Sequence, residues 1–215
     1  LRGRRDPKLA SAAASEADTI LLVGSESGTT WGFANTLQTA LSAQGVRVYV
    51  GPMSKFEPGR WLKARRVILL AATYGDGTAP ASAKGFIERF GGAHASAGMP
   101  LAVLGFGDHS FPAFCGFAAE VARIAKDKGW ASLIPFDTVD RQSPQDFARW
   151  GRRLAETLGL DFELNHQPTV PKTWRLPLII PPRLWRKHTG HYRHPPLCPA
   201  EDFALAASGG QGIPA

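Results

Sequence analysis

The sequence predicts an α/β protein in which helices cover both faces of a doubly wound parallel sheet. Apolar runs of strand length alternate with amphipathic helical patterns along residues 19–160, which is the order of successive βαβ units. The apolar runs are also continuous rather than alternating, as strands buried on both faces should be. We therefore expect five parallel strands in the order 2-1-3-4-5.

The first half of this region starts with the apolar run TILLV, residues 19–23, which stops at a glycine. An amphipathic helix is predicted over residues 30–44, because the glycine directly after it is typical of a helix C-terminus. A valine-rich strand is expected at 46–50. Residues 51–63 contain two prolines and predict irregular structure. The third strand is expected at 67–72.

The second half repeats the alternation of strands and helices. Strands are expected at residues 101–104 and 133–136, where short apolar runs occur. Helices are predicted at 83–90, 117–128 and 144–158, since apolar residues recur there at helical spacing.

The composition is typical of a globular protein and argues against several classes. The chain has 215 residues, of which 44% are hydrophobic, so it can bury a sizeable core. It lacks the long apolar run of a transmembrane helix. Two distant cysteines, Cys115 and Cys198, predict a reducing compartment, and we expect a cytoplasmic location. The net charge of +7 is spread out rather than gathered in a stripe, so no nucleic-acid partner is expected.

Residues 1–18 are predicted to be a linker, because they combine a basic cluster with Ala/Ser-rich sequence. A basic cluster such as residues 1–5 is usually part of a solvated tail. Clusters of this kind also occur directly after a transmembrane helix, on its cytoplasmic side. A membrane tether upstream of the chain, at the cytoplasmic face of the inner membrane, is therefore a second expectation.

The turn after the first predicted strand has the composition of an anion site. Residues 24–30 (GSESGTT) place hydroxyls and backbone N–H groups at a helix N-terminus, where the helix dipole favours a phosphate. The turn holds no Lys or Arg, which suits a mononucleotide better than a triphosphate. Helix capping by a serine or threonine is the alternative interpretation, and this turn alone does not decide between the two.

Two further turns place aromatic residues among glycines at neighbouring strand ends. Residues 73–77 (TYGDG) follow the third strand, and residues 105–115 (GFGDHSFPAFC) follow the fourth. Because the carboxyl ends of parallel strands meet at one edge, all three turns should converge on one crevice. Aromatic rings on such loops suggest a flat, ring-bearing mononucleotide, although Tyr74 and Phe111 could instead simply close the end of the sheet.

The three turns together resemble the flavodoxin-like FMN domain of the diflavin reductases, such as the sulfite reductase flavoprotein and cytochrome P450 reductase. The runs SESGTT, ATYGDG and GFGDHSF…FC are similar to the family's motifs, in the same order and spacing. This resemblance covers roughly residues 19–160. It implies a flavodoxin-like fold, with FMN as the cofactor and electron transfer as the role.

The resemblance also implies which residues bind FMN. The first turn would hold the phosphate, and Tyr74 and Phe111 would flank the isoalloxazine ring. No catalytic residue and no metal ligand is expected. The predicted cofactor-binding residues are Ser25, Glu26, Ser27, Gly28, Thr29, Thr30, Ala72, Thr73, Tyr74, Gly75, Phe106, Gly107, Asp108, His109, Ser110, Phe111, Phe114 and Cys115.

Four residues depart from the family pattern. Trp31 follows the first turn at a position where an acidic residue is common. Glu26 stands where glutamine is usual and would oppose a phosphate unless its side chain points away. Phe111 replaces the usual tyrosine, so stacking is kept and a hydroxyl is lost. His109 is new at the loop and either titrates near the flavin or is a solvated loop residue. We also expect few cations near the ring, which would disfavour negatively charged reduced flavin.

Residues 161–215 hold more than half of the 17 prolines and predict a poorly ordered tail. A metal site at His188, His191 and His194 is not favoured, because no acidic or cysteine partner has ligand spacing. In diflavin reductases an FAD- and NADPH-binding module begins here. The tail does not resemble that module beyond about Leu176, so we expect a truncated or frame-shifted start of it.

The sequence therefore predicts an FMN-binding domain that relays electrons from a reductase module, or another donor, to an unknown acceptor protein. A second hypothesis is the FMN part of an NADPH-dependent reductase that acts with a separate FAD module. A third is a degenerate domain that no longer binds flavin and serves as an interaction module, which Glu26 and the tail leave open.

Overall fold

The computed structural model describes residues 11–93 and 99–167 of the chain. They form a sheet of five parallel strands in the order β2-β1-β3-β4-β5, which confirms the predicted topology. The strands are β1 (Thr19–Gly24), β2 (Val48–Pro52), β3 (Arg66–Ala72), β4 (Leu101–Gly107) and β5 (Asp137–Asp140).

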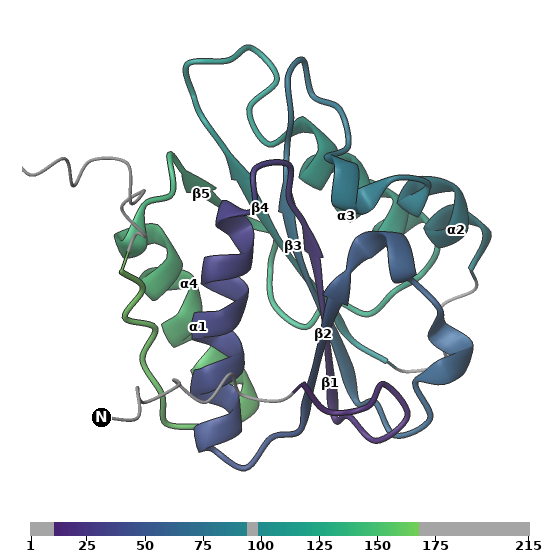
Figure 1. Cartoon of the computed structure of the whole chain (residues 1–215), viewed down its shortest axis with the longest axis vertical. Coiled ribbons are helices and arrows are strands. Elements are labelled where there is room, and N and C mark those ends of the chain that lie inside the picture. The colour runs from purple at the N-terminus through teal and green to yellow at the C-terminus, as the bar shows by residue number, and fades with distance from the viewer. Residues whose placement is uncertain (1–10, 94–98, 168–215) are drawn as a thin grey trace, which may run out of the picture. The chain divides into compact units, whose positions relative to one another are not determined.

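Helices cover both faces of this sheet. In Figure 1, α1 and α4 lie on one face while α2 and α3 lie on the other. Three short 3-10 turns, named η1 to η3, complete the fold. The helical elements are α1 (Thr29–Ala43), η1 (Met53–Lys55), η2 (Pro58–Arg60), η3 (Ala81–Ala83), α2 (Phe86–Gly92), α3 (Gly116–Asp127) and α4 (Pro144–Leu158).

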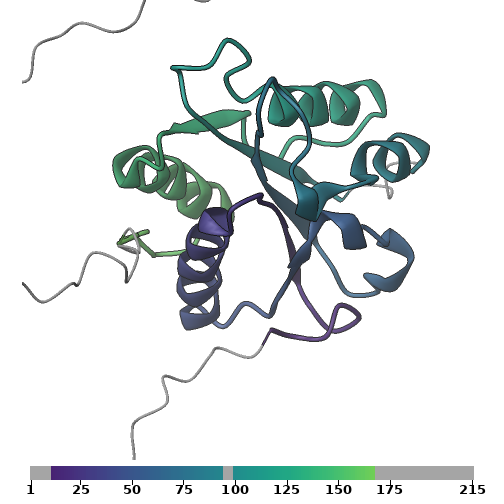
Figure 2. The same cartoon turned by 45° about the horizontal axis from the view of Figure 1, so that its top comes forward.

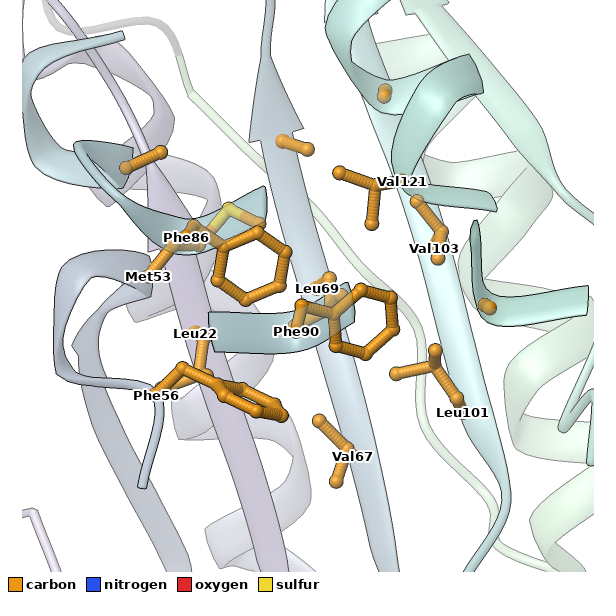
Figure 3. Close-up of a cluster of buried hydrophobic side chains, with 14 of the residues drawn as sticks. Leu22, Met53, Phe56, Val67, Leu69, Phe86, Phe90, Leu101, Val103 and Val121 are labelled. Atoms are coloured by element: carbon orange, nitrogen blue, oxygen red, sulfur yellow. The ribbon is translucent and has the colours of Figure 1, made fainter. Parts of the chain in front are cut away.

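Each face of the sheet packs against its own hydrophobic cluster. Leu22 and Leu69 point toward the same cluster, where Leu22 lies beside Phe56 and Leu69 beside Phe90 of α2 (Figure 3). Their strand neighbours Leu21 and Leu70 point to the opposite face, toward α1 and α4. Successive side chains of a strand alternate in this way, so continuous apolar runs serve both clusters. Burying each such side chain contributes about 1.5–3 kcal/mol.

The connection from β2 to β3 is irregular, as predicted, but it contributes to the core. Phe56 and Trp61 are both buried there. The ring of Phe56 lies 5.3 Å from that of Phe86 and 5.4 Å from that of Phe90, both edge-on. These contacts anchor a segment that has no long helix to cover the sheet.

Two predicted elements were misplaced. The helix expected at 83–90 is η3 followed by α2, because Gly85 adopts a positive φ of 67° between them. The strand expected at 133–136 is wrong. Leu133 N donates to Leu101 O at 2.8 Å, but the continuous pairing with β4 starts only at Asp137. β5 is a polar edge strand (DTVD) in which Val139 alone is fully buried, so it carries no apolar run.

Residues 11–18, predicted as linker, pack against the sheet. Ala12 N donates to Val48 O at 2.9 Å, and Ser11 Oγ accepts from Val50 N at 2.8 Å. Ala17 is fully buried. These bonds satisfy the outer edge of β2, and covering an edge strand in this way prevents it from pairing with other chains.

Residues 161–167, placed in the predicted tail, also belong to the packed structure; we call them the C-terminal strap. Their side chains alternate between buried and exposed, with Phe162, Leu164 and His166 buried. The ring of His166 stacks on Phe33 of α1 at a centroid distance of 3.8 Å. The basic cluster at 1–5 and the tail from 168 lie outside the described residues, and so do His188, His191 and His194, for which no metal site was favoured.

Candidate functional site

The three predicted turns meet at one edge of the sheet. The strand register pairs Gly24 with Ala71, and Ala72 with Phe106, so β1, β3 and β4 end at nearly the same level. The turns that follow these strands lie together at that edge, which Figure 2 brings forward. The convergence expected from strand order is therefore observed.

The first turn leads into α1 without a side-chain cap. Ser25 Oγ accepts from Gly28 N at 3.0 Å, and Gly28 takes a positive φ of 91° directly before the helix. Among the described residues, no side chain caps the helix, and its first turn contains no acidic residue. The alternative interpretation, in which a serine or threonine side chain caps the helix, is therefore not observed. The free N–H groups of the first helical turn make a site that favours an anion.

Glu26 is turned toward a different segment. Its Oε2 accepts from Ala81 N at 2.6 Å, at the start of η3. Next to this bond, Ser82 Oγ accepts from Ser25 N at 2.6 Å and donates to Val23 O at 3.2 Å. Residues 81–82 thus hold the first turn in place through hydrogen bonds to Glu26, Ser25 and Val23. Their role was not predictable from the sequence, because it depends on contacts between residues more than 50 positions apart.

The second turn is closed by a pair of backbone bonds. Tyr74 N donates to Thr78 O at 3.1 Å, and Thr78 N donates to Tyr74 O at 2.9 Å. Gly75 and Gly77 have positive φ values of 52° and 99°, which glycine adopts without strain. The Tyr74 side chain remains 54% exposed. Among the described residues, none forms a hydrogen bond with the buried Thr73 Oγ1.

The third turn contains a network around Asp108. Asp108 Oδ1 accepts from Ser110 N at 2.7 Å and from Arg141 Nε at 3.0 Å. These hydrogen bonds, the one from Ser110 first, lower the pKa of the Asp108 carboxyl. His109 stacks on Phe114 at a centroid distance of 3.5 Å, and its backbone N donates to Asp140 Oδ1. Phe111 points outward and is 56% exposed.

Cys115 ends the third turn as a buried group. Its φ of 52° places it in the left-handed region directly before α3. A Cβ at Gly107 would come within 2.9 Å of Cys115 N, so the close approach of these two segments requires glycine. Burial first, and the nearby Asp140 second, raise the pKa of the Cys115 thiol to about 12. The thiol is therefore a small apolar wall and not a nucleophile.

The second and third turns enclose a pocket of about 580 Å³. Tyr74 and Phe111, the two half-exposed rings, both line it. The lining residues are Ala72, Thr73, Tyr74, Gly75, Phe106, Gly107, Asp108, Phe111, Ala113, Phe114, Cys115, Arg141 and Gln142.

The pocket and the prediction overlap without being identical. Residues 25–30 do not line the pocket, nor do His109 and Ser110. Three lining residues were not predicted: Ala113, Arg141 and Gln142. Arg141 brings one cation to this pocket, which the sequence did not predict. Arg141 and Gln142 directly follow β5, so a correct prediction of β5 would have placed both residues at this edge of the sheet.

Comparison with known proteins identifies the family of this fold. A profile of the Flavodoxin family matches residues 21–150. The chain belongs to the flavodoxin family. The predicted fold, the FMN cofactor and the electron-transfer role are thereby confirmed.

Similar curated proteins are flavoprotein subunits of sulfite reductase. The chain is 31% identical over 133 residues to the sulfite reductase [NADPH] flavoprotein alpha-component of Thiocapsa roseopersicina, covering 60% of this chain and 25% of that protein. The Bacillus subtilis protein of the same name is 28% identical over 143 residues, covering 66% and 24% respectively. The chain thus spans about a quarter of the length of these relatives.

Solved flavodoxins share the fold. The flavodoxin of Streptococcus pneumonia TIGR4 superposes with a TM-score of 0.58 at 25% identity, covering 66% of this chain and 97% of that one. Oxidised Flavodoxin 1 from Bacillus cereus gives a TM-score of 0.57 at 20% identity, covering 66% and 97% respectively.

The residues present fit FMN. Thr73, which lines the pocket, has a buried hydroxyl without a partner among the described residues, and an uncapped helix N-terminus follows the neighbouring strand. Two half-exposed aromatic rings suit a flat heterocycle. Within residues 11–93 and 99–167, no group of three His, Cys, Asp or Glu residues is placed to hold a metal ion. No helix in those residues is long and apolar enough to span a bilayer.

Proposed function

We propose that the three turns hold FMN together, with its phosphate at residues 24–30 and its isoalloxazine ring against Tyr74 and Phe111. The observation that supports this most is the pairing of two half-exposed rings on one pocket beside an uncapped helix N-terminus. A flat ring and a phosphate at these two places describe a flavin mononucleotide.

The phosphate would be held by neutral donors. Ser27, Thr29 and Thr30 supply hydroxyls around the start of α1, and the helix dipole adds a partial positive charge. The hydroxyls of Ser27 and Thr29 lie 3.3 Å apart. Glu26 does not oppose the phosphate in this arrangement, because its carboxylate is bonded to Ala81 N. Ser25 acts inside the turn, through its bond from Gly28 N.

The ring would lie in the pocket between the second and third turns. When bound, FMN supplies the redox chemistry by taking up and releasing electrons and protons. The protein's part is to hold the ring and keep water from it. Phe114 and Cys115 form an apolar wall, and Thr73 Oγ1 offers a hydrogen bond. Tyr74 and Phe111 stack on the ring and leave part of it accessible for electron transfer.

We infer that the electrons come from an FAD- and NADPH-binding reductase module and pass to a separate acceptor protein. The support comes from the relatives, which are NADPH sulfite reductase flavoproteins about four times the length of the matched segment. An NADPH-dependent reductase activity would then belong to the pair of modules, and the residues from 168 onward would connect this domain to the second module.

A cytoplasmic location agrees with such a partner, since thiols stay reduced there and NADPH is available. The basic residues at 2, 4 and 5 support the further proposal of a membrane segment upstream, with the domain on the cytoplasmic side. Translating the codons that precede Leu1 tests this, and a polar sequence there would contradict it.

The binding of FMN is tested by its colour and its fluorescence. The full chain should turn yellow with FMN and quench its fluorescence. Tyr74→Ala and Phe111→Ala should each weaken binding about tenfold, because each removes one stacking ring. Phe136→Ala is the matched control, since Phe136 is a 41% exposed aromatic that does not line the pocket. A colourless wild-type chain would favour the degenerate interaction domain instead.

The donor is tested by adding components one at a time. NADPH alone should leave the FMN of this chain oxidised under anaerobic conditions. Adding a purified FAD-containing reductase module should then reduce it, which stopped-flow absorbance follows. Rapid reduction by NADPH alone would contradict the need for a second module.

A further inference from the structure

Arg141 is a cation at the pocket, and an uncommon backbone conformation brings it there. Arg141 and Gln142 follow β5 with φ values of 44° and 59°. Two successive non-glycine residues in the left-handed region are strained, and such strain persists only where surrounding contacts impose it. Here Arg141 N donates to Gly107 O at 2.8 Å, which joins the end of β5 to the third turn.

The guanidinium of Arg141 lies between two carboxylates. Its Nε donates to Asp108 Oδ1 at 3.0 Å, and its Nη2 donates to Ser110 Oγ at 3.3 Å. Asp140 Oδ2 is 3.9 Å from the same Nε. Asp140 also faces His109, whose Nδ1 lies 3.3 Å from Asp140 Oδ1. Without Arg141, two negative charges would stand at or beside the pocket.

These charges matter because reduction changes the charge of the ring. Oxidised FMN that takes up two electrons and one proton gains one negative charge. Carboxylates nearby oppose this gain, and a cation nearby favours it. Asp108 and Arg141 both line the pocket, so both act on the ring directly. Asp140 precedes Arg141 in the chain and does not line the pocket, so its charge acts on the ring from a greater distance.

We propose that Arg141 sets the reduction potential of FMN in this pocket, by offsetting Asp108 and Asp140 so that reduced, negatively charged FMN is tolerated. This inference rests on the proposed function, because it requires FMN at the pocket. It makes Arg141 a tuning residue that acts by charge. It also distinguishes this pocket from the cation-poor one that the three motifs predict.

A merely structural role for Arg141 is the competing explanation. Its bonds to Asp108, Ser110 and Gly107 could do no more than hold the third turn in place. In that case its loss would weaken oxidised and reduced FMN equally. A charge effect changes the ratio of the two dissociation constants, and that ratio fixes the reduction potential.

The experiment compares this ratio in the full chain and in Arg141→Gln. Fluorescence quenching gives the dissociation constant of oxidised FMN, and an anaerobic dithionite titration against a reference dye gives the two-electron potential. We expect Arg141→Gln to raise the ratio of the dissociation constant of reduced FMN to that of oxidised FMN about tenfold. This corresponds to a two-electron reduction potential about 30 mV more negative. An unchanged ratio would overturn the proposal.

Two further variants make the result specific. Arg149→Gln is the matched control, because Arg149 is paired with Asp146 at 2.6 Å and does not line the pocket; its ratio should not change. Asp140→Asn should lower the ratio, since it removes an opposing charge. If Arg141→Gln binds no FMN, Asp140→Asn provides the test instead. An unchanged ratio in Asp140→Asn then overturns the proposal. A wild-type chain that binds no FMN would refute the proposed function as well, whereas tight binding with unchanged ratios refutes this inference alone.

Discussion

At the scale of single residues, Thr73 combines a position on the pocket with a hydroxyl that has no partner among the described residues. Its hydroxyl oxygen is buried, and no described residue forms a hydrogen bond with it. A buried polar atom without a partner costs free energy in the unliganded protein. In the proposed FMN site, a hydrogen bond between the cofactor and this hydroxyl would recover that cost.

Thr73→Val should therefore separate stability from binding. Valine has nearly the same shape without the oxygen, so the free energy of unfolding of the unliganded chain should stay equal or rise by up to about 1 kcal/mol. FMN affinity should fall about fivefold to tenfold, because one hydrogen bond to the cofactor is lost. Urea unfolding and FMN fluorescence titration measure the two quantities.

Thr39→Val provides the comparison for this test. The Thr39 hydroxyl donates to Asn35 O on the exposed side of α1 and does not line the pocket, so FMN affinity should not change. A Thr73→Val chain that binds FMN as tightly as wild type would show that the hydroxyl has no part in the site.

Glu26 illustrates a residue whose role could not be inferred from its type. A carboxylate in a phosphate turn suggested a degenerate site. In the structure it accepts a hydrogen bond from Ala81 N, so it fastens the turn to η3. The side chain's direction depends on a segment more than 50 residues away, and no local pattern encodes that contact.

At the scale of elements, the C-terminal strap is the part that sequence periodicity suggested least. Alternating burial at Phe162, Leu164 and His166 resembles a strand, yet the strap pairs with no strand of the described sheet. It lies against α1 and α4, where Gly151 leaves room for Leu164. A Cβ at Gly151 would approach Leu164 Cδ1 to 2.5 Å.

Gly151 and Leu164 should behave as a coupled pair. Leu164→Ala should lower the free energy of unfolding by about 2–4 kcal/mol through the cavity it leaves. Gly151→Ala should lower it by about 1–2 kcal/mol through the clash, although alanine favours helix. In the double variant the losses should be less than additive, because the clash disappears with the leucine. Strict additivity in urea unfolding would rule out the packing described.

His166 should make the stability of the strap depend on pH. Burial lowers the pKa of His166 below its usual value, so the folded chain binds a proton less readily than the unfolded chain. The stability from the neutral ring is thus complete above about pH 6.5 and is lost as the pH falls through the lower folded pKa. Urea midpoints at a series of pH values should show this decrease.

One variant isolates the contribution of this histidine. His166→Phe keeps a ring on Phe33 and should flatten the decrease below about pH 6.5. An unaltered slope in His166→Phe would assign the pH dependence to other groups.

At the scale of the whole molecule, the packed unit is longer than the region that shows alternation. The segment 11–18 bonds to the edge of β2, and the strap 161–167 buries three side chains. A chain limited to residues 19–160 would lose both. It should be less stable than a chain of residues 11–167 by several kcal/mol, because it exposes that apolar surface and an open strand edge.

Comparing the two truncated chains by thermal unfolding tests this directly. The longer one should match the full chain within about 1 kcal/mol and bind FMN with the same affinity. Equal stability of the two truncated chains would mean that the flanking segments contribute nothing to the fold.

The sequence was sufficient for the order of the strands and for most of the residues that line the pocket. Continuous apolar runs fix β1, β3 and β4, and glycine-rich turns directly follow those strands, so Tyr74 and Phe111 could be placed at one edge. These are local signals. β5 was not predicted at its correct position, because an edge strand with one fully buried residue has no apolar run to recognise. Arg141 and Gln142, which follow β5, were therefore not predicted as pocket residues.

The sequence by itself determined that this protein is a flavodoxin-like domain with three turns at one end of a parallel sheet. The tertiary structure alone decided which way Glu26 points, that Arg141 stands at the pocket between Asp108 and Asp140, and that the strap closes over α1. The physical reason is the sequence separation of the interactions involved. Strand and turn preferences depend on neighbouring residues, whereas the charge and packing of the site depend on contacts between segments far apart in the chain.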